Sequence, residues 1–501
     1  MKRVIFWSLF VFFLASGCEN EADIPRNEIV YASTRDIRDI HPHLYSGEIA
    51  AQTLVFEPLV KNSWDGIQPA LAEDWEISPD GLEYTFYLRK DVTFTDGEPF
   101  NAHVVKKNID AVLSNRERHA WLELVHAIQE GVVVDEYTYK LVLHYPDYPT
   151  LTELGLARPF RFLSPNCFID RETKDGIRCH VGTGPFILDE HVENQYARFV
   201  ANDNYWGEQA KVDAVKWRVM PDDQTILLAL EKGEIDLIFG SDGDMIDIDS
   251  FHALEEAGKY VTKLSEPIAT RALLLNSNRA ITGDVNVREA LQYAIDKETL
   301  AEDVLNGVET AADTLFAKTI PYSDIPLEVR SYDQEKAMKL LDKAGWHVGK
   351  DGYRYKDGNI LELSLYYNAS NAQERTISEF IQHEFRKVGV KLNIIGEEKQ
   401  AFNDREKSGA FDVIYSLTWG VPYDPQSYVS SWRIPAHGDY QAQLGLDRKE
   451  WLDAQIANLF VETDEEKRKR QYEEILTYIH NEHLYVPLTY LRTKVVHVPE
   501  L

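Results

Sequence analysis

The chain has 501 residues, 44% of them hydrophobic, and a formal net charge of −30 at pH 7 from 83 acidic and 53 basic side chains. This composition is that of a globular protein long enough for two or more lobes. The negative charge repels phosphate backbones and anionic lipid head groups, which argues against a nucleic-acid-binding protein and against a basic membrane-surface protein.

The first segment has the pattern of an export signal. Lys2 and Arg3 precede an apolar run over residues 4–14, and three small residues follow at 15–17. A charged start, a short apolar core and a small-residue cleavage site are typical of a signal peptide, and the run is too short to span a bilayer permanently. Residues 1–17 are therefore predicted to be a cleaved signal, and no later segment is apolar enough to span.

Cys18 directly follows the small residues, an arrangement that resembles a bacterial lipobox, although Leu14 stands one place further upstream than usual. We expect Cys18 to be acylated and residues 18–27 to form a polar tether. The protein would then be exported and held at the cell membrane, facing the periplasm or the cell exterior. A plain secretory signal with an incidental cysteine is the alternative.

The other two cysteines are Cys167 and Cys179. In an oxidising exported compartment a local disulfide between them is plausible, and either this disulfide or two idle thiols is favoured over a metal site. A metal site formed with His180 lacks the paired spacing of structural zinc sites.

Strand and helix patterns alternate along the remaining chain, which predicts an α/β fold. A short strand begins at residue 28, and two alternating strands follow within 71–100, with turns at 79–81 and 95–97, before a helix from Ala102. Residues 287–295 form a second amphipathic helix. A strand at 361–365, a helix closed by Gly389 and a strand at 391–395 form a βαβ unit. Residues 271–276 and 485–496 are candidates for two hinge segments between lobes.

Residues 71–100 closely resemble the signature of the family 5 extracellular solute-binding proteins, which serve peptide and nickel importers. Further marks of that family follow in order at residues 182–186, 204–207, 233–237, 287–290 and 344–346. The resemblance implies a two-lobed periplasmic-binding-protein fold with an extra subdomain, a two-strand hinge and a ligand cleft between the lobes. It places lobe I at residues 28–268 plus 488–501 and lobe II at 269–487.

The same resemblance implies the solute-binding component of an ABC importer, with permease and ATPase subunits as partners. It implies a monomer that is not an enzyme and uses no catalytic cofactor. Four further stretches look most like the nickel-binding branch and its metallophore-binding relatives, at residues 115–124, 157–162, 418–425 and 433–443. Proteins of that branch capture nickel already held by a small chelator, such as histidine.

The resemblance assigns roles to individual residues. Arg118 and Arg158 match arginines that hold the chelator's carboxylates, which a guanidinium can grip through two parallel hydrogen bonds. Trp121, Trp419 and Tyr423 match the aromatic wall of the cleft. His437 matches the histidine that reaches the metal, for which a neutral imidazole is a good donor. Without the resemblance, a surface charge, core packing and a satisfied histidine would be the default interpretations.

Several alternatives remain open. A receptor for a metal–opine metallophore, or for di- or tripeptides, would share the fold, and a ligand-sensing receptor would use it without transport.

The chain departs from the nickel-binding pattern at one place, because it has Phe402 and Asn403 where nickel-binding relatives place a tyrosine. An exported metal-dependent hydrolase is disfavoured, because the chain lacks a Gly-x-Ser-x-Gly elbow and its His480 and His483 stand three apart rather than four. The native chelator and the preference among nickel, cobalt and zinc stay open.

Overall fold

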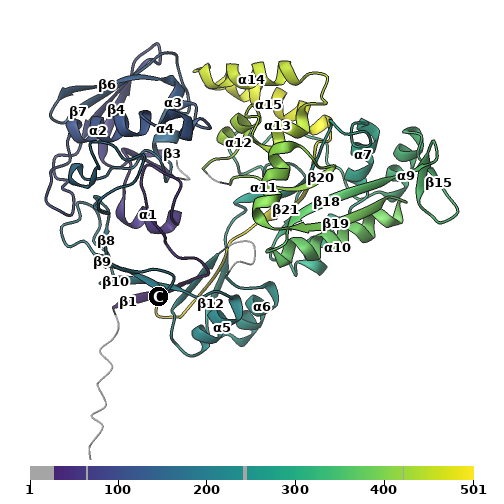
Figure 1. Cartoon of the computed structure of the whole chain (residues 1–501), viewed down its shortest axis with the longest axis horizontal. Coiled ribbons are helices and arrows are strands. Elements are labelled where there is room, and N and C mark those ends of the chain that lie inside the picture. Colours follow the sequence, from purple (N-terminus) through teal and green to yellow (C-terminus); the bar gives the residue numbers. More distant parts are fainter. Residues whose placement is uncertain (1–26, 64–65, 241–244, 421) are drawn as a thin grey trace, which may run out of the picture.

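The computed structural model of the chain describes residues 27–63, 66–240, 245–420 and 422–501. The predicted signal peptide at 1–17, Cys18 and the tether up to residue 26 lie outside these residues. Within them, no helix combines the length and the apolar character needed to cross a membrane. The described chain is divided among three main β-sheets, whose arrangement defines the lobes (Figure 1).

A seven-stranded sheet forms the base of the first lobe, in the order β12-β22-β11-β1-β10-β9-β8. Its strands are β1 (Glu28–Ser33), β8 (Phe186–Val192), β9 (Tyr196–Ala201), β10 (Ala214–Val219), β11 (Leu237–Gly240), β12 (Val261–Leu264) and β22 (Lys494–His497). Its helices are α5 (Asp223–Glu231) and α6 (Ile248–Ala257), which begin at Asp222 and Asp247. Each aspartate accepts a backbone hydrogen bond in the first turn, which stabilises the helix start.

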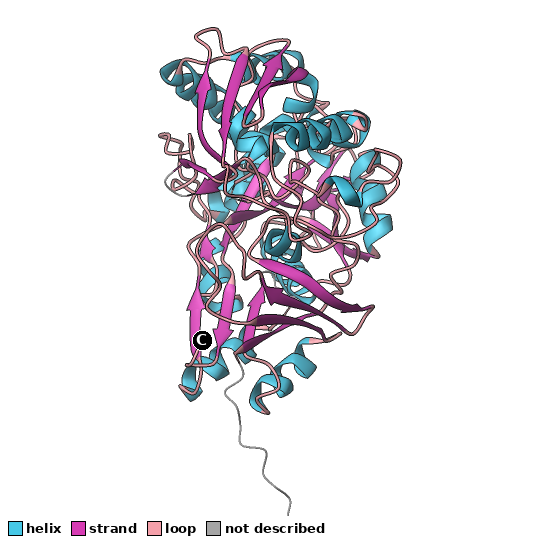
Figure 2. Cartoon of the chain, turned by 90° about the vertical axis from the view of Figure 1, so that its left-hand side faces the viewer, coloured by secondary structure: helices cyan, strands magenta, loops and turns pink. Residues whose placement is uncertain are grey.

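A separate subdomain of the first lobe lies above this sheet (Figures 1 and 2). It contains an antiparallel sheet in the order β4-β5-β7-β6 and its own hydrophobic core. Its elements are β2 (Val60–Ser63), β3 (Gly66–Pro69), β4 (Ala72–Ile77), β5 (Glu83–Leu88), α2 (Ala102–Leu113), α3 (Leu124–Ala127), β6 (Ile128–Asp135), β7 (Thr138–Leu143) and α4 (Thr150–Leu154). The preceding helix α1 (Ile49–Val55) packs instead with residues of the seven-stranded sheet. The predicted hairpin with its turn at 79–81 and the predicted helix from Ala102 are confirmed.

The two cysteines of the first lobe, Cys167 and Cys179, are joined in a disulfide. Cys167 is fully buried in a hydrophobic cluster that includes residues of β8, β9 and β10. The neighbouring His180 pairs instead with Asp39, at 2.9 Å between Nε2 and Oδ1. These three side chains are therefore engaged with partners other than a metal.

The second lobe is built on a six-stranded sheet in the order β14-β21-β13-β20-β18-β19. Its strands are β13 (Ala269–Leu275), β14 (Thr310–Ala311), β18 (Glu362–Asn368), β19 (Lys391–Glu397), β20 (Val413–Leu417) and β21 (Tyr485–Leu491), and a small sheet adds β15 (His347–Val348), β16 (Arg354–Lys356) and β17 (Asn359–Ile360). Its helices are α7 (Val285–Tyr293), α8 (Lys297–Thr299), α9 (Gln334–Lys343), α10 (Ala372–Lys387), α11 (Lys399–Ser408), α12 (Gln426–Ser431), α13 (Gly438–Gln443), α14 (Lys449–Val461) and α15 (Glu465–Asn481). The predicted βαβ unit is β18–α10–β19, whose strands pair in parallel.

The chain passes between the two larger sheets through short segments after β12 and after β21. Residues 265–268 and 492–493 run side by side, since Ser265 N donates to Thr493 O at 3.0 Å and Ile268 N donates to Leu491 O at 2.9 Å. The predicted hinge segment 271–276 lies in β13, inside the second sheet, because its run of buried leucines pairs with β20 and β21. The other predicted hinge segment, 485–496, does contain one of the two connections between the sheets, at residues 492–493. The lobe boundaries at residues 268 and 487 stay a prediction.

Candidate ligand-binding site

Two arginines of the first lobe share one aromatic ring. Arg118 lies in a short 3-10 helix, η1 (Arg116–His119), and Arg158 lies in the loop after α4. Their guanidinium carbons are 5.5 Å and 5.4 Å from the centre of the Tyr45 ring. Arg158 donates a hydrogen bond to Gly47 O at 3.2 Å, and burial lowers the pKa of its guanidinium. Within the described residues, neither arginine has a carboxylate partner, so both positive charges are available to an anion.

Tyr45 links these arginines to the aromatic wall. The indole of Trp121 donates to the Tyr45 hydroxyl at 2.7 Å, and that hydroxyl is 2.8 Å from Nδ1 of His119. Because an indole N–H can only donate, the Tyr45 hydroxyl accepts from Trp121, and it donates to His119 in the tautomer whose Nδ1 is unprotonated. Tyr45 could not be identified from the sequence, since a single aromatic residue in a loop belongs to no periodic pattern.

The second lobe presents its aromatic residues on the turn between β20 and α12. The amides of Tyr423 and Asp424 both donate to Gly420 O, and the Asp424 carboxylate accepts from Trp419 N at 3.1 Å. Gly420 has φ +77°, and a Cβ there would lie 2.9 Å from Ile268 O. Burial raises the pKa of Asp424 to about 7, although hydrogen bonds from Thr418 and the turn's amides oppose the shift. The turn therefore holds Trp419 and Tyr423 in fixed positions.

The aromatic residues of the two lobes meet in the closed arrangement. The Trp121 and Trp419 rings are 5.7 Å apart edge to face, and the Trp121 and Tyr423 rings are 6.2 Å apart. An ion pair lies beside them, with Arg433 Nη2 3.0 Å from Glu123 Oε2. Sequence reasoning gave no role to Glu123 or Arg433, because nothing in a sequence pairs residues 310 positions apart.

His437 lies at the far end of the aromatic wall, at the start of α13, with its ring 5.7 Å from that of Trp419. Burial lowers its pKa, so the imidazole is neutral at pH 7 and retains a lone pair. The described residues contain no group of three His, Cys, Asp or Glu side chains arranged to hold a metal ion. A metal at His437 would therefore need most of its ligands from a small molecule.

A polar pocket of about 270 Å³ opens beside His437. Its walls come from α11, β20, the turn and α13, and are formed by Asn403, Glu406, Lys407, Ser416, Leu417, Trp419, Tyr428, Ala436, His437, Gly438 and Asp439. Phe402 packs into the hydrophobic core, whereas its neighbour Asn403 faces the pocket. Burial and the nearby carboxylates of Asp439 and Glu374 raise the pKa of Glu406 to about 7.

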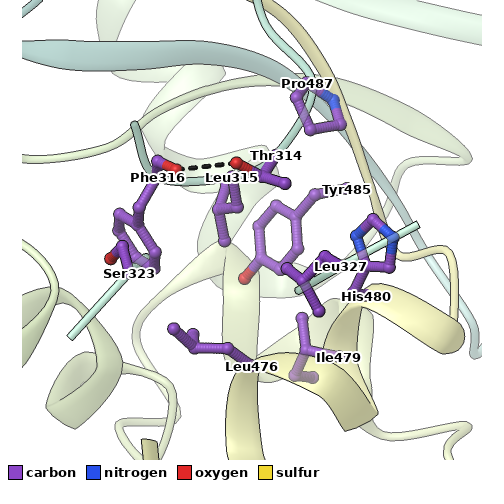
Figure 3. A pocket seen from close by; sticks show the side chains of 10 residues that line it. All are labelled: Thr314, Leu315, Phe316, Ser323, Leu327, Leu476, Ile479, His480, Tyr485 and Pro487. Atoms are coloured by element: carbon purple, nitrogen blue, oxygen red, sulfur yellow. Dashed lines mark hydrogen bonds between the residues drawn. The ribbon is translucent and has the colours of Figure 1, made fainter. Parts of the chain in front are cut away.

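Another pocket in the second lobe is too small for a chelate (Figure 3). Its volume is about 30 Å³, enough for little more than one water molecule, and its walls are mostly apolar. His480 lines it, but the ring of that histidine is 2.9 Å from Glu328 O. In the first lobe, His41 and His43 are buried and bound to Thr173. These histidines have structural roles.

The sequence and structure were compared with known proteins. Residues 66–440 match the model of the bacterial extracellular solute-binding proteins, family 5. The chain is 42% identical over 479 residues to the nickel-binding periplasmic protein of Escherichia coli K12, covering 95% of this chain and 91% of that one. NikA from Brucella suis, solved with Fe(III)-EDTA, has 44% identity and a TM-score of 0.93, over 94% of this chain and 95% of that one.

A third relative is more distant. NikZ from Campylobacter jejuni, solved with Ni(L-His), has 25% identity and a TM-score of 0.80, over 95% of both chains. These matches confirm the predicted two-lobed α/β fold and the predicted resemblance to nickel-binding proteins. The chain belongs to the bacterial extracellular solute-binding proteins of family 5, and it is a binding protein that serves an ABC importer rather than an enzyme.

Proposed function

We propose that this protein captures nickel as a complex with a small chelator, such as nickel–histidine, and delivers it to a membrane permease. The observation that carries the proposal is a series of neighbouring side chains, which we call the wall, running from Arg118 and Arg158 to His437. Two arginines without acidic partners lie at one end of it, aromatic rings from both lobes lie in the middle, and a neutral imidazole lies at the other end.

Each part of this wall suits one part of a metal chelate. Arg118 and Arg158 would bind the carboxylates of the chelator, because a guanidinium donates two parallel hydrogen bonds to a carboxylate. Trp121, Trp419 and Tyr423 would enclose its apolar faces with rigid rings. His437 would donate to a coordination position that the chelator leaves open, and imidazole suits divalent nickel.

The names of the relatives support nickel as the cargo. The relative from Escherichia coli is a nickel-binding protein, and that from Campylobacter jejuni was solved with Ni(L-His). The relative from Brucella suis was solved with a different chelate, Fe(III)-EDTA. We therefore propose a site for a chelated metal, with nickel–histidine as its preferred form.

We further propose that the mature protein acts as a monomer, anchored to the membrane by lipid on Cys18, and meets permease and ATPase subunits there. The pattern at residues 2–18 supports export and anchoring. Cys18→Ala should release the protein into the soluble fraction of cells. An unchanged membrane fraction would show that Cys18 is not the anchor.

Isothermal titration of the ligand-free protein tests the cargo. The protein should bind nickel with two equivalents of L-histidine more tightly than it binds a metal–opine complex or a panel of di- and tripeptides. Tighter binding of a peptide or an opine complex would replace the nickel–histidine proposal with that ligand. Gene neighbours that encode permeases and ATPases would favour transport over a sensing role.

A further inference from the structure

The pocket beside His437 differs in charge from the other end of the aromatic wall. Glu406 and Asp439 contribute two carboxylates to its lining, and Lys407 contributes one ammonium group. The arginine end contributes two guanidinium groups that form no ion pair with a described carboxylate, and the carboxylate whose charge acts on Arg158 is that of Glu48, which is paired with Arg38. A molecule lying along the wall would therefore meet positive charge at one end and negative charge at the other.

A series of neighbouring side chains connects the arginine end of the wall to the pocket. Both arginines lie over Tyr45, the Tyr45 ring is 5.9 Å from Trp121, and Trp121 is 5.7 Å from Trp419. Trp419 is in turn 5.7 Å from His437, and these last two residues line the pocket. The pocket thus shares Trp419 and His437 with the proposed chelate site and lies at the end of the wall away from the arginines.

The two carboxylates of the pocket differ in the hydrogen bonds that they accept. Asp439 is buried, and its Oδ1 accepts hydrogen bonds from the hydroxyls of Tyr428 and Tyr485 at 2.8 Å and 2.6 Å. Glu406 is half-buried, on the inner side of α11, and its carboxylate makes no hydrogen bond or ion pair with a described residue. A partly buried carboxylate without donors is costly, and a ligand that supplies N–H donors or positive charge would remove that cost.

We infer that Glu406 is a specificity-determining residue, which makes the site favour amino-acid chelates of the metal over polycarboxylate chelates. This inference rests on the proposed function and names the chemical class of the chelator. A histidine complex of nickel carries N–H groups on its amines and imidazoles, and it is not anionic. An aminopolycarboxylate complex is anionic and has no N–H group, so Glu406 and Asp439 would repel it and find no donor.

The test compares two nickel complexes at pH 8, above the pKa of about 7 that burial and nearby carboxylates give Glu406, so that its carboxylate is ionised. The probes are nickel with two equivalents of L-histidine and nickel–EDTA, titrated into the wild-type protein and into Glu406→Gln, which keeps the shape of the side chain and removes its charge. The quantity measured is the ratio of the two dissociation constants. Glu406→Gln should reduce the preference for nickel–histidine roughly tenfold, the value of a hydrogen bond to a charged group.

Two further variants sharpen the result. Lys407→Gln removes the positive charge beside Glu406, so it should shift the ratio in the opposite direction, towards nickel–histidine. Glu335→Gln makes the same charge change on the exposed face of α9, where its side chain is 82% exposed, and should leave the ratio unchanged. Thermal unfolding of each variant verifies that the fold is intact.

The possible outcomes separate this inference from the proposed function. A reduced ratio in Glu406→Gln, with an unchanged ratio in Glu335→Gln, supports the role of Glu406. An equal ratio in wild type and Glu406→Gln, or a wild type that prefers nickel–EDTA, overturns the inference while the protein remains a nickel-chelate receptor. A wild type that binds neither complex overturns the proposed function itself.

Discussion

At the scale of single residues, Arg158 is the most informative position in the proposed site. Arg158→Ala should weaken binding of nickel–histidine by about 2–5 kcal/mol, because the chelator's carboxylate would be left desolvated without its partner. Arg118 is more exposed, so Arg118→Ala should cost less. Isothermal titration measures both, and Arg218→Ala, which removes a surface guanidinium from β10, is the control. Equal affinities for wild type and Arg158→Ala would assign Arg158 a structural role.

His437 makes a second prediction at this scale. His437→Ala should lower the affinity for nickel–histidine and change the visible spectrum of the bound nickel, because one imidazole donor is lost. Protonation removes the lone pair, and burial lowers the pKa of His437 below the ordinary value of about 6.5. The affinity advantage of wild type over the mutant should therefore persist at pH 7 and shrink only as the pH falls below about 6.5.

The comparison with the mutant matters here because the free chelator also takes up protons as the pH falls. Only the difference between the two proteins reports on His437. A mutant with the wild-type affinity and spectrum at pH 7 would exclude His437 as a direct ligand. The opine or peptide alternative would then be favoured.

Sequence reasoning could name some site residues and not others. Arg118, Arg158 and His437 were named because they lie in motifs that resemble those of a family, and the structure brings them to one wall. Tyr45 lies in no such motif, although it touches both arginines. Glu406 is a charged residue on a polar helix, and only the tertiary structure shows that it faces a pocket.

At the scale of elements, the turn between β20 and α12 depends on Gly420. Gly420→Ala should destabilise the protein because φ is +77° there and a Cβ would press on Ile268 O, beside the crossing segment. Gly233→Ala is the matched control, since φ is +71° but nothing lies within 4 Å of the added Cβ. Urea unfolding should show a loss of about 1 kcal/mol for the control and a further 1–3 kcal/mol for Gly420→Ala. Equal losses of unfolding free energy in the two variants would mean that the structure accommodates the Cβ beside Ile268 O without cost.

Elements with strong local patterns were predictable, and those set by long-range pairing were not. The strand, helix and strand of 361–395 follow from alternation, a helical apolar face and Gly389. The hinge was predicted at 271–276, but that run is apolar enough to be a buried strand, and only its pairing with β20 and β21 assigns it to the second sheet. The crossing itself occurs in two segments, 265–268 and 492–493, that are too short to show a periodic pattern.

At the scale of the whole molecule, the lobes also touch at a second place, through Tyr148 in the loop before α4. Its amide donates to Phe460 O at 2.9 Å, and its hydroxyl donates to Glu465 Oε2 at 2.8 Å. The guanidinium of Arg468 lies 3.4 Å from the centre of its ring. These contacts join the first lobe to α14 and α15, involve none of the proposed ligand-binding residues, and stabilise the closed arrangement.

Tyr148→Ala should therefore weaken binding of every ligand by the same factor, roughly fivefold to thirtyfold, because a smaller fraction of the protein would be closed. Small-angle X-ray scattering should show a more open ligand-free molecule. Tyr353→Ala is the matched control, since the Tyr353 ring makes the same kind of contact with Arg386, at 3.9 Å, but within the second lobe. A change that alters the preference between ligands would contradict a role limited to closure.

The central claim is that the natural cargo is a nickel chelate. The most direct measurement is native mass spectrometry, with elemental analysis, of the exported protein purified from its own cells without added metal. We expect one nickel ion per protein together with one or two small molecules of an amino-acid chelator. A bound peptide without metal, or a chelate of a metal other than nickel, would contradict the claim.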